Sequence, residues 1–572
     1  MASSCLYPYP RIPDDILRLI FHDVAPLAAA AEIPVSIDGH WQTYQRTSDI
    51  NDIRSLIHVS QVCQQWRAVA LGAANLWSNI WVENDHWRYE MLTRTRDAPL
   101  MLIHLDDKKG ISAMMPLISL LHRVKYLRLR VKRGDTPTLF NGPFSHSAPL
   151  LETFSLKLCN PSPVLDIPRN LFASDTPRLR SLCIEGRLSS KNLLQSRILD
   201  NLTELRLSRP GCSTGLDIVW SAIYRIRNRL ETLVLHNVLP YFSSDPSWPL
   251  DAGRASVIDL PKLTHLEISA QSHACASFTK QLKISPHAKV FYAITHTEDV
   301  DGRAVAEYFP SMLHPIPRMS TIQLRSLFFS VGCAEDYPDV PVFKCGAGRL
   351  VGPLRDEPKS FATGTQLTIH FDLVDLAPAE DEFTIVYAIC HCLYLDSVQD
   401  VVLQQVGLAE PNRWIKLLGR LTGVERLVLR SKESLPILAL LAGVLSSSAA
   451  SEEWLETFGA TCPLPRLTTL YLLSWDFRET HVGNPLPLES MNAATVIVGD
   501  EDLLGEGEGE VGIPALLLDV LRRLASQSDP PHHRTGGGLA ELQFVDCHIT
   551  ETQVQAFEGV VSKVCLDGEV SD

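Results

Sequence analysis

A short spacing of apolar residues recurs from about residue 120 onward, and it constrains the fold more than any other feature of the chain. An apolar residue is followed by two others, a second apolar residue, one other, and a third apolar residue. The second and third positions place both side chains on one face of an extended segment, so each copy predicts a short strand. The copies are Val124/Leu127/Leu129, Leu151/Phe154/Leu156, Leu179/Leu182/Ile184, Leu202/Leu205/Leu207, Leu230/Leu233/Leu235, Leu263/Leu266/Ile268, Met319/Ile322/Leu324, Val398/Val401/Leu403, Val424/Leu427/Leu429, Leu467/Leu470/Leu472 and Leu539/Leu542/Phe544.

The spacing alone is weak evidence, but two further features set these copies apart. In a chain of 572 residues with 45% hydrophobic residues, three such positions recur by chance roughly 50 times. Five copies also carry a proline two residues upstream with polar residues in the gap, where composition predicts roughly one; these are Pro149, Pro177, Pro261, Pro317 and Pro465. The first six copies start at 124, 151, 179, 202, 230 and 263, in steps of 27, 28, 23, 28 and 33. Such a period is typical of repeat proteins.

A unit of this kind leaves its apolar edges open, so neighbouring units must stack to bury them. We expect the upstream proline to stop the preceding helix or loop and to set an extended approach to the strand. The pattern resembles leucine-rich repeats, although the usual asparagine-bearing turn is mostly absent; Cys159-Asn160 and His236-Asn237 come nearest to it. We therefore predict an irregular α/β solenoid over residues 121–565. Irregular loops are expected at about 331–365, where Cys345-Gly346-Ala347-Gly348 lies, and at 477–512 and 525–538.

Residues 11–82 carry a different pattern, which predicts a small helical module. Pro13 suits the start of a helix because its missing N–H would be unpaired there in any case. Ile16, Leu17, Ile20 and Phe21 follow at helical spacing. A second helix is expected from about Ser55 to Ala70, followed by an apolar edge over residues 75–81.

Three stretches of this module resemble the F-box family, in the expected order: Ile12-Pro13-Asp14-Asp15-Ile16-Leu17-Arg18-Leu19-Ile20-Phe21, Val59-Ser60-Gln61-Val62-Cys63-Gln64-Gln65-Trp66-Arg67, and Leu76-Trp77-Ser78-Asn79-Ile80. The resemblance implies three short helices that pack on a Skp-type adaptor. Carried over by position, the adaptor-facing or interface-supporting residues are Pro13, Ile16, Leu17, Ile20, Val59, Val62, Cys63, Trp66 and Leu76. Asp23 to Arg54 is an insertion between the first two helices, and residues 83–120 are expected to form a linker and the start of the solenoid.

Charge and composition exclude several other classes of protein. The formal net charge of −14 argues against a broad nucleic-acid-binding surface, which needs clustered lysine and arginine. No apolar run approaches the roughly 20 residues that span a bilayer, and residues 1–10 lack the pattern of a secretory signal. Thirteen cysteines without a repeated spacing indicate reduced thiols, and hence a cytoplasmic or nuclear protein without membrane contact.

Motifs that carry chemistry are weak, so we expect neither a cofactor nor a metal, and no enzymatic activity. His391 lies between Cys390 and Cys392, but a structural zinc site needs four ligands and no second pair accompanies it. The expected alternative is an ordinary helix with one exposed imidazole. The glycines at 536–538 lack the lysine and the flanking elements of a P-loop.

The resemblance implies an adaptor that binds a Skp-type subunit and, through it, a cullin, while the solenoid holds a substrate protein of unknown identity. Outward residues of the strands, such as Arg128, Lys157, Arg206 and Arg426, are expected to contribute substrate contacts. One alternative is a repeat-based interaction scaffold without any ligase. The other is an enzyme whose site lies in the aperiodic region 331–396.

Overall fold

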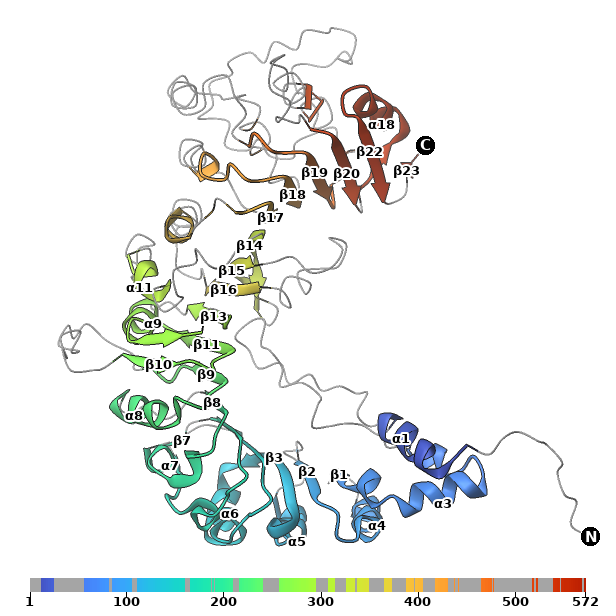
Figure 1. The fold of residues 1–572 in the computed structure, drawn as a ribbon, viewed down its shortest axis with the longest axis vertical. Helices are drawn as coiled ribbons and strands as arrows, with labels where there is room; N and C mark the ends of the chain where they lie inside the picture. Colours follow the sequence, from blue (N-terminus) through green and yellow to red (C-terminus); the bar gives the residue numbers. More distant parts are fainter. Residues whose placement is uncertain are drawn as a thin grey trace, which may run out of the picture. The chain divides into compact units, whose positions relative to one another are not determined.

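The structure is a computed structural model of the chain (Figure 1). It describes residues 12–24, 56–81, 85–104, 111–159, 165–186, 188–189, 191–208, 216–239, 257–285, 287–294, 307–313, 326–334, 337–348, 365–372, 387–393, 395, 397–404, 417–430, 437, 441, 464–475, 477, 517–518, 521–522, 539–545, 547–567 and 570–571. The chain divides into two compact units. Unit 1 comprises residues 1–244 and 258–269, and unit 2 comprises residues 245–257 and 270–572.

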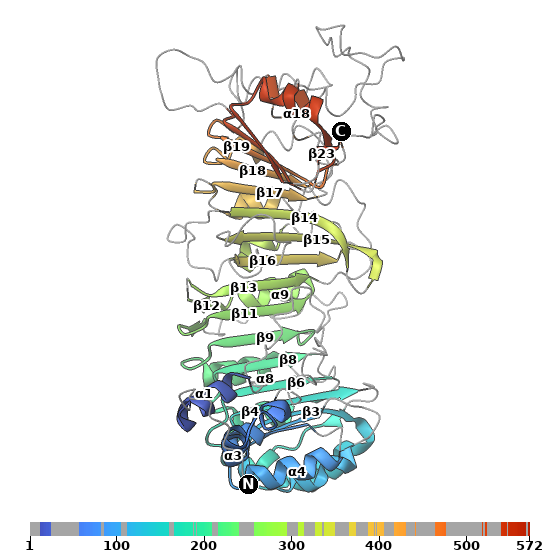
Figure 2. The same cartoon turned by 90° about the vertical axis from the view of Figure 1, so that its right-hand side faces the viewer.

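Unit 1 is built on a parallel sheet whose strands pair in the order in which they occur along the chain (Figure 2). Its strands are β1 (Asn79–Trp81), β2 (Leu100–His104), β3 (Val124–Lys132), β4 (Thr153–Cys159), β6 (Ser181–Glu185), β8 (Glu204–Ser208), β9 (Thr232–His236) and β11 (His265–Ala270). The short strands β5 (Leu165–Asp166) and β7 (Leu188–Ser189) form a separate parallel pair. A mixed α/β fold with a parallel sheet is thereby confirmed.

The apolar spacing found in the sequence corresponds to the strands and sets their register. Its second positions lie side by side from strand to strand: Leu127, Phe154, Leu182, Leu205, Leu233 and Leu266. All six side chains are fully buried. The same alignment joins Val401, Leu427, Leu470 and Leu542 in unit 2. Each copy in the described residues is therefore a strand, and the apolar rows form the core; the copy at Met319 lies outside the described residues.

The upstream prolines occupy a tight turn rather than an extended approach, which corrects the expected role. Leu179 N–H donates to the carbonyl of Thr176 at 3.1 Å, so Pro177 is the second residue of a four-residue turn. The equivalent bonds enclose Pro149, Pro261 and Pro465. Proline is favoured at this position because its fixed φ matches the turn. The backbone N–H groups of the next two residues then donate to a carbonyl of the preceding repeat, as those of Arg180 and Ser181 do to the carbonyl of Glu152.

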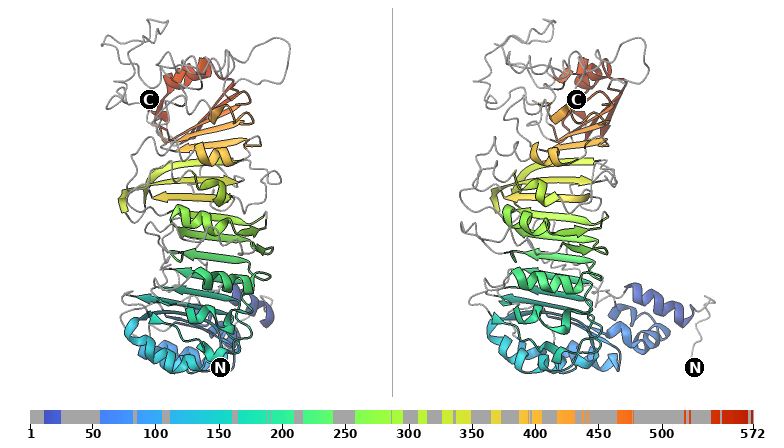
Figure 3. Two further views of the ribbon diagram at one scale, coloured as in Figure 1. Left: turned by 90° about the vertical axis from the view of Figure 1, so that its left-hand side faces the viewer. Right: turned by 60° about the vertical axis from the view of Figure 1, so that its left-hand side comes forward.

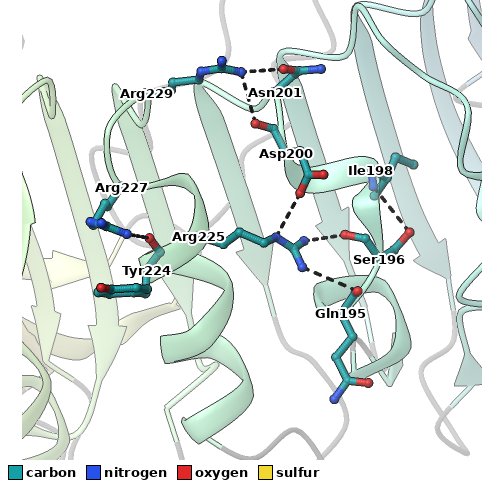
Figure 4. A network of polar contacts seen from close by, with 9 residues as sticks. All are labelled: Gln195, Ser196, Ile198, Asp200, Asn201, Tyr224, Arg225, Arg227 and Arg229. Carbon is teal, nitrogen blue, oxygen red and sulfur yellow. Dashed lines mark hydrogen bonds and ion pairs between the residues drawn. The ribbon is translucent and has the colours of Figure 1, made fainter.

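Helices connect the strands of unit 1 and lie along one face of its sheet (Figure 3). They are α4 (Asp85–Thr95), α5 (Met115–Ile118), α6 (Thr136–Asn141), α7 (Lys191–Leu194) and α8 (Leu216–Ile226), with 3-10 turns η2 (Ile111–Met114), η3 (Leu121–Arg123), η4 (Arg133–Asp135), η5 (Pro143–Ser145), η6 (Leu171–Ser174) and η7 (Arg197–Leu199). Arg225 attaches helix α8 to the preceding segment of unit 1. It donates to the carbonyls of Gln195 and Ser196 and pairs with Asp200 at 3.1 Å (Figure 4).

The N-terminal module contains α1 (Asp14–Val24), α3 (Gln64–Gly72) and the 3-10 turn η1 (Ala74–Trp77). The single helix expected from Ser55 to Ala70 is wrong, because residues 56–59 form one helical turn and α3 starts only at Gln64. Ser60 Oγ bonds back to the carbonyl of Ile57 at 2.6 Å, and Cys63 adopts an extended conformation (φ −155°). The Cys63 thiol then caps the new helix by accepting from Trp66 N–H.

Unit 2 contains parallel strands interrupted by an antiparallel insertion. The strands are β13 (Lys289–Ile294), β14 (Ser326–Ala334), β15 (Tyr337–Gly348), β16 (Thr365–Asp372), β17 (Asp400–Gln404), β18 (Arg426–Arg430), β19 (Thr469–Leu473), β20 (Glu541–Val545) and β22 (Lys563–Asp567), with the short strands β12 (Leu282–Ile284), β21 (Ile549–Thr550) and β23 (Val570–Ser571). The helices are α9 (Ser272–Thr279), α11 (Phe309–Leu313) and α18 (Glu551–Glu558). Strand β15 runs antiparallel between β14 and β16, whereas β13–β16 and β14–β17 are parallel.

This insertion corrects the loop expected at 331–365, because residues 345–348 belong to β15. Pairing with a strand on each side holds this glycine-containing segment in the sheet despite its low strand propensity. Strand β1 also lies within the predicted 11–82 module, so the sheet starts well before residue 121. Most of the predicted insertion 23–54 and of the predicted loops 477–512 and 525–538 lies outside the described residues.

Candidate interaction surfaces

Helix α1 has two apolar faces, only one of which is covered. Leu17 and Phe21, four residues apart, are fully buried. Ile16, Leu19 and Ile20 lie on another face and are 43%, 64% and 40% exposed, and Ile12, just before the helix, is also exposed. Positions 12, 16, 19 and 20 have the spacing of a continuous helical stripe. Val62, in the turn before α3, is 61% exposed. We call Ile12, Ile16, Leu19, Ile20 and Val62 the N-terminal apolar stripe.

The buried face of α1 is what holds the module together. The rings of Phe21 and Trp66 lie 5.2 Å apart at 59°. Gln65 Nε2 donates to the carbonyl of Ile12 and to Asp14 Oδ1, at 2.9 Å each. Trp77 Nε1 donates to the carbonyl of Ala70 at 2.9 Å, which joins α3 to η1. These contacts fix how the stripe is presented.

The residues predicted from the F-box resemblance fall into two groups. Leu17 and Leu76 are buried, and Val59 and Trp66 are partly buried, so these four support the module. Pro13, Ile16, Ile20, Val62 and Cys63 are exposed. The prediction did not include Ile12 and Leu19, although their spacing relative to Ile16 and Ile20 is visible in the sequence.

A second accessible surface lies on the sheet of unit 1, opposite its apolar rows. Along β3, β4 and β6 buried residues alternate with partly exposed ones. The exposed positions are Tyr126, Arg128, Arg130, Lys132, Thr153, Ser155, Lys157, Cys159, Ser181, Cys183 and Glu185, which we call the β3–β6 outer face. In β8, β9 and β11 the outward residues after the first one of each strand are buried as well. Among the described strands, this sheet face is most accessible on β3, β4 and β6; elsewhere Met101, Glu204, Thr232 and His265 are partly exposed.

The four strand residues expected to contact substrate differ in their surroundings. Arg128 and Lys157 are partly exposed on the β3–β6 outer face, and Lys157 Nζ pairs with Glu185 at 2.6 Å. Arg206 is only 6% exposed and pairs with Glu204, so its expected accessibility is wrong. The neighbouring outward residues on β9 and β11 are buried too. Arg426, in unit 2, has an exposed side chain and pairs with Asp400 at 2.5 Å.

The buried part of the same sheet face contains a carboxylate between two imidazoles. Glu267 Oε1 lies 2.7 Å from His236 Nε2, and Oε2 lies 3.3 Å from His265 Nε2. Burial opposes ionisation of Glu267, but the hydrogen bonds to both histidines outweigh it and lower its pKa to about 2. On the β3–β6 outer face, desolvation raises the pKa of the partly exposed Cys183 thiol to about 11, so this thiol stays protonated near neutral pH.

Other chemistry-bearing residues are not gathered into a site in the part of the chain that the structure describes. No group of three or more histidine, cysteine or acidic side chains there is placed to hold a metal ion. His391 is exposed on a short helix, with its ring 6.0 Å from that of Tyr387, while Cys390 is buried. None of the described helices is long and apolar enough to cross a membrane.

No protein-family model matches the sequence, and no curated protein matches it. Among solved structures, an internalin from Listeria monocytogenes is similar at 10% sequence identity and a TM-score of 0.21. The match covers 71% of this chain and 80% of the internalin chain.

Proposed function

We propose that the protein is an F-box adaptor with a leucine-rich-repeat-like solenoid. The N-terminal module would bind a Skp-type subunit of a cullin-RING (SCF) ubiquitin ligase, and the solenoid would recruit the substrate protein. The observation that carries the proposal is the exposure of the N-terminal apolar stripe. Three of its residues, Ile16, Ile20 and Val62, are among those that the F-box resemblance assigns to the adaptor interface.

Side chains such as Ile16 and Leu19 would be expected in the module's interior if the module served only its own stability. They are instead exposed, although the same helix buries Leu17 and Phe21 on an adjacent face. Clustered exposed apolar side chains mark a surface that a partner covers. Asp14 and Arg18 lie away from the stripe by their helical spacing, as expected for a helix that is bound on one face.

The function needs no chemistry from this chain. Holding a substrate close to a ligase raises the effective concentration of its lysines near the activated ubiquitin, and other subunits carry out the transfer. Catalytic residues, cofactors and metals are therefore not part of the proposal.

The test is co-purification of the full chain with a Skp-type adaptor. Ile16→Glu/Ile20→Glu places charges in the stripe without opening the core, so the variant should fold and lose adaptor binding. Arg18→Glu/His22→Glu changes exposed residues on the same helix and should retain binding. Such surface substitutions usually alter stability by less than about 0.5 kcal/mol. Thermal unfolding of all three proteins checks that they are folded.

Two results would overturn the proposal. The first is an intact protein that does not bind the adaptor, which would favour the interaction scaffold without a ligase. The second is a folded stripe variant that binds as well as the intact protein, because the stripe would then not be the docking surface.

A further inference from the structure

We infer that the turns before β6, β8, β9 and β11 form a binding site for a phosphate group carried by a partner protein. The site consists of Arg178, Arg180, Asn201, Arg229 and Lys262, and we call it the arginine turn edge. The inference rests on the proposed function only in taking this partner to be the recruited protein. Phosphate binding itself does not depend on the ligase.

Three of the four cations of the arginine turn edge occupy the same position in neighbouring repeats. The strand pairing places four residues side by side from β6 to β11: Ser181, Glu204, Thr232 and His265. The residues three places before them are Arg178, Asn201, Arg229 and Lys262. Neighbouring strands lie about 4.8 Å apart, so these positions span about 15 Å. All four cations are exposed.

Asn201 holds two of the guanidinium groups in place. Its backbone carbonyl accepts a hydrogen bond from Arg180 Nη1 at 3.0 Å. Its side-chain Oδ1 accepts from Arg229 Nη1 (Figure 4). Its Nδ2 donates to the carbonyl of Pro177 at 3.1 Å, which fixes the orientation of the amide. Two arginines from the turns on either side are therefore directed to one residue.

The backbone beneath these side chains is hydrogen-bonded from one repeat to the next. The N–H groups of Thr203 and Glu204 donate to the carbonyl of Arg180, and those of Glu231 and Thr232 donate to the carbonyl of Thr203. A ligand therefore does not have to order the backbone of the site, which lowers the entropic cost of binding.

The positive charge of the arginine turn edge is not neutralised by the described residues. The hydrogen-bond acceptors of Arg180 and Arg229 are backbone carbonyls and the neutral side-chain amide of Asn201. Arg178 and Lys262 form neither an ion pair nor a side-chain hydrogen bond with any described residue. All four charges are thus accessible to a ligand.

Few anions accompany these cations. The turn segments 176–180, 199–203, 226–231 and 260–264 contain two carboxylates, Asp200 and Glu231. Asp200 pairs with Arg225, so Glu231 alone stands against the four cations. The whole chain carries a net charge of −14, which makes this edge a local reversal of the protein's charge. Neighbouring cations repel each other, and a bound anion would relieve that repulsion.

A phosphate monoester suits two converging arginines better than a carboxylate does. It carries a charge of about −1.5 to −2 at pH 7 and has three strong acceptor oxygens. Guanidinium groups donate to such oxygens in pairs. Among the described residues Arg180 and Arg229 use only Nη1, so their other N–H groups can donate to a ligand. Lys262, one strand away from Arg229, adds a further charge.

The test measures binding of a fluorescein-labelled peptide, Gly-Ser-phosphoserine-Ser-Gly, to the full-length protein by fluorescence anisotropy. Arg180→Gln/Arg229→Gln should weaken binding about tenfold or more, because it removes charge-assisted hydrogen bonds. Arg178→Gln/Lys262→Gln should weaken it about three- to fivefold. The second variant changes side chains that bond to no described residue, so it should leave the fold unchanged.

The matched control is Arg96→Gln/Arg169→Gln. It removes the same charge from exposed sites elsewhere in unit 1 and should change the affinity less than about twofold. Thermal unfolding of all variants shows whether lost binding reflects misfolding. The same peptide with serine in place of phosphoserine should not bind, and one with glutamate should bind about tenfold more weakly or worse.

The inference is overturned if the intact protein does not bind the phosphoserine peptide, or if the serine or glutamate peptide binds equally well. It is also overturned if the folded Arg180→Gln/Arg229→Gln variant binds like the control. Should that variant unfold, Arg178→Gln/Lys262→Gln decides, and binding equal to the control's overturns the inference. Since no adaptor is present, failure here leaves the adaptor proposal standing, and failure of adaptor binding leaves this result standing.

Discussion

At the scale of single residues, the most unusual group is Glu267, a carboxylate with 1% exposure on the outward side of β11. A lone buried charge would be neutralised by a shift of its pKa. Here His236 from β9 and His265 from β11 both hydrogen-bond to it, so its ionised form is the stable one. Most residues on both sides of β9 and β11 are buried, so an apolar residue would be expected at position 267. The two histidines allow a carboxylate there, because they hydrogen-bond to it.

Glu267 predicts a specific dependence of stability on pH. Its pKa in the folded protein, about 2, lies below the ordinary 4.5. The ionised group therefore contributes stability above pH 4.5, and this contribution is lost as the pH falls toward 2. It amounts to at most about 3 kcal/mol. Urea unfolding of the intact protein and Glu267→Gln between pH 2 and 6 should show the intact protein losing more stability over that interval. Parallel curves would contradict the assignment.

At the scale of elements, the tight turn before each strand explains why proline recurs in the sequence. The turn bond from Leu179 to Thr176 has counterparts without proline, such as Leu202 to Leu199 and Val424 to Leu421. Proline is therefore favourable but not required, which is why only some copies carry it. The sequence indicated a structural role for the proline correctly, but the turn could be recognised only from its hydrogen bond.

The hydrogen bonds of Arg225 join two consecutive repeats within unit 1, and their contribution to stability can be measured. Arg225→Met keeps the aliphatic stem but removes the bonds to Gln195 and Ser196, and it should lower the free energy of unfolding by about 1–2 kcal/mol. The ion pair with Asp200 contributes little, because both side chains are more than a third exposed. Arg227→Met, in the turn after α8, removes a bond to the Tyr224 carbonyl and a cation–π contact with the Tyr224 ring, and should change stability by at most about 1 kcal/mol (Figure 4). Equal effects in urea unfolding would argue against this role of Arg225.

At the scale of the whole molecule, each compact unit contains an apolar row. Leu205 lies in the row of unit 1, and Leu470 in that of unit 2; both are fully buried. In a stacked fold each strand depends mainly on its immediate neighbours. Damage to one row should therefore remain largely local.

Leu205→Ala and Leu470→Ala test this. Each truncation should cost about 3–4 kcal/mol, because it leaves a cavity in a packed row. Hydrogen exchange followed by mass spectrometry should show faster exchange in β6, β8 and β9 in the first variant and in β18 and β19 in the second. Uniformly faster exchange over both units in either variant would indicate that they unfold together.

The repeated apolar spacing identified β3, β4, β6, β8, β9 and β11 in unit 1 and β17 to β20 in unit 2, because each copy carries its own burial pattern. It missed β1, β13, β14, β16 and β22. It also missed β2, whose register places Pro99 at the first position and His104 at the third, and β15, where glycines and prolines obscure the alternation. Strands β2 and β15 form because a neighbour on each side supplies hydrogen bonds, which is not a local property. The spacing of Ile12, Ile16, Leu19 and Ile20 was likewise visible, but not that this face would remain exposed.

The amino-acid sequence by itself determined where most of the parallel strands lie, which of their side chains form the core, and how the first helix begins, because these depend on local spacing and turn chemistry. Only the tertiary structure decided which outward residues stay accessible. Arg206 and Glu267 have the same strand pattern as Arg128, yet they are buried and Arg128 is not. Accessibility depends on what packs over a strand, and residues distant in sequence determine that.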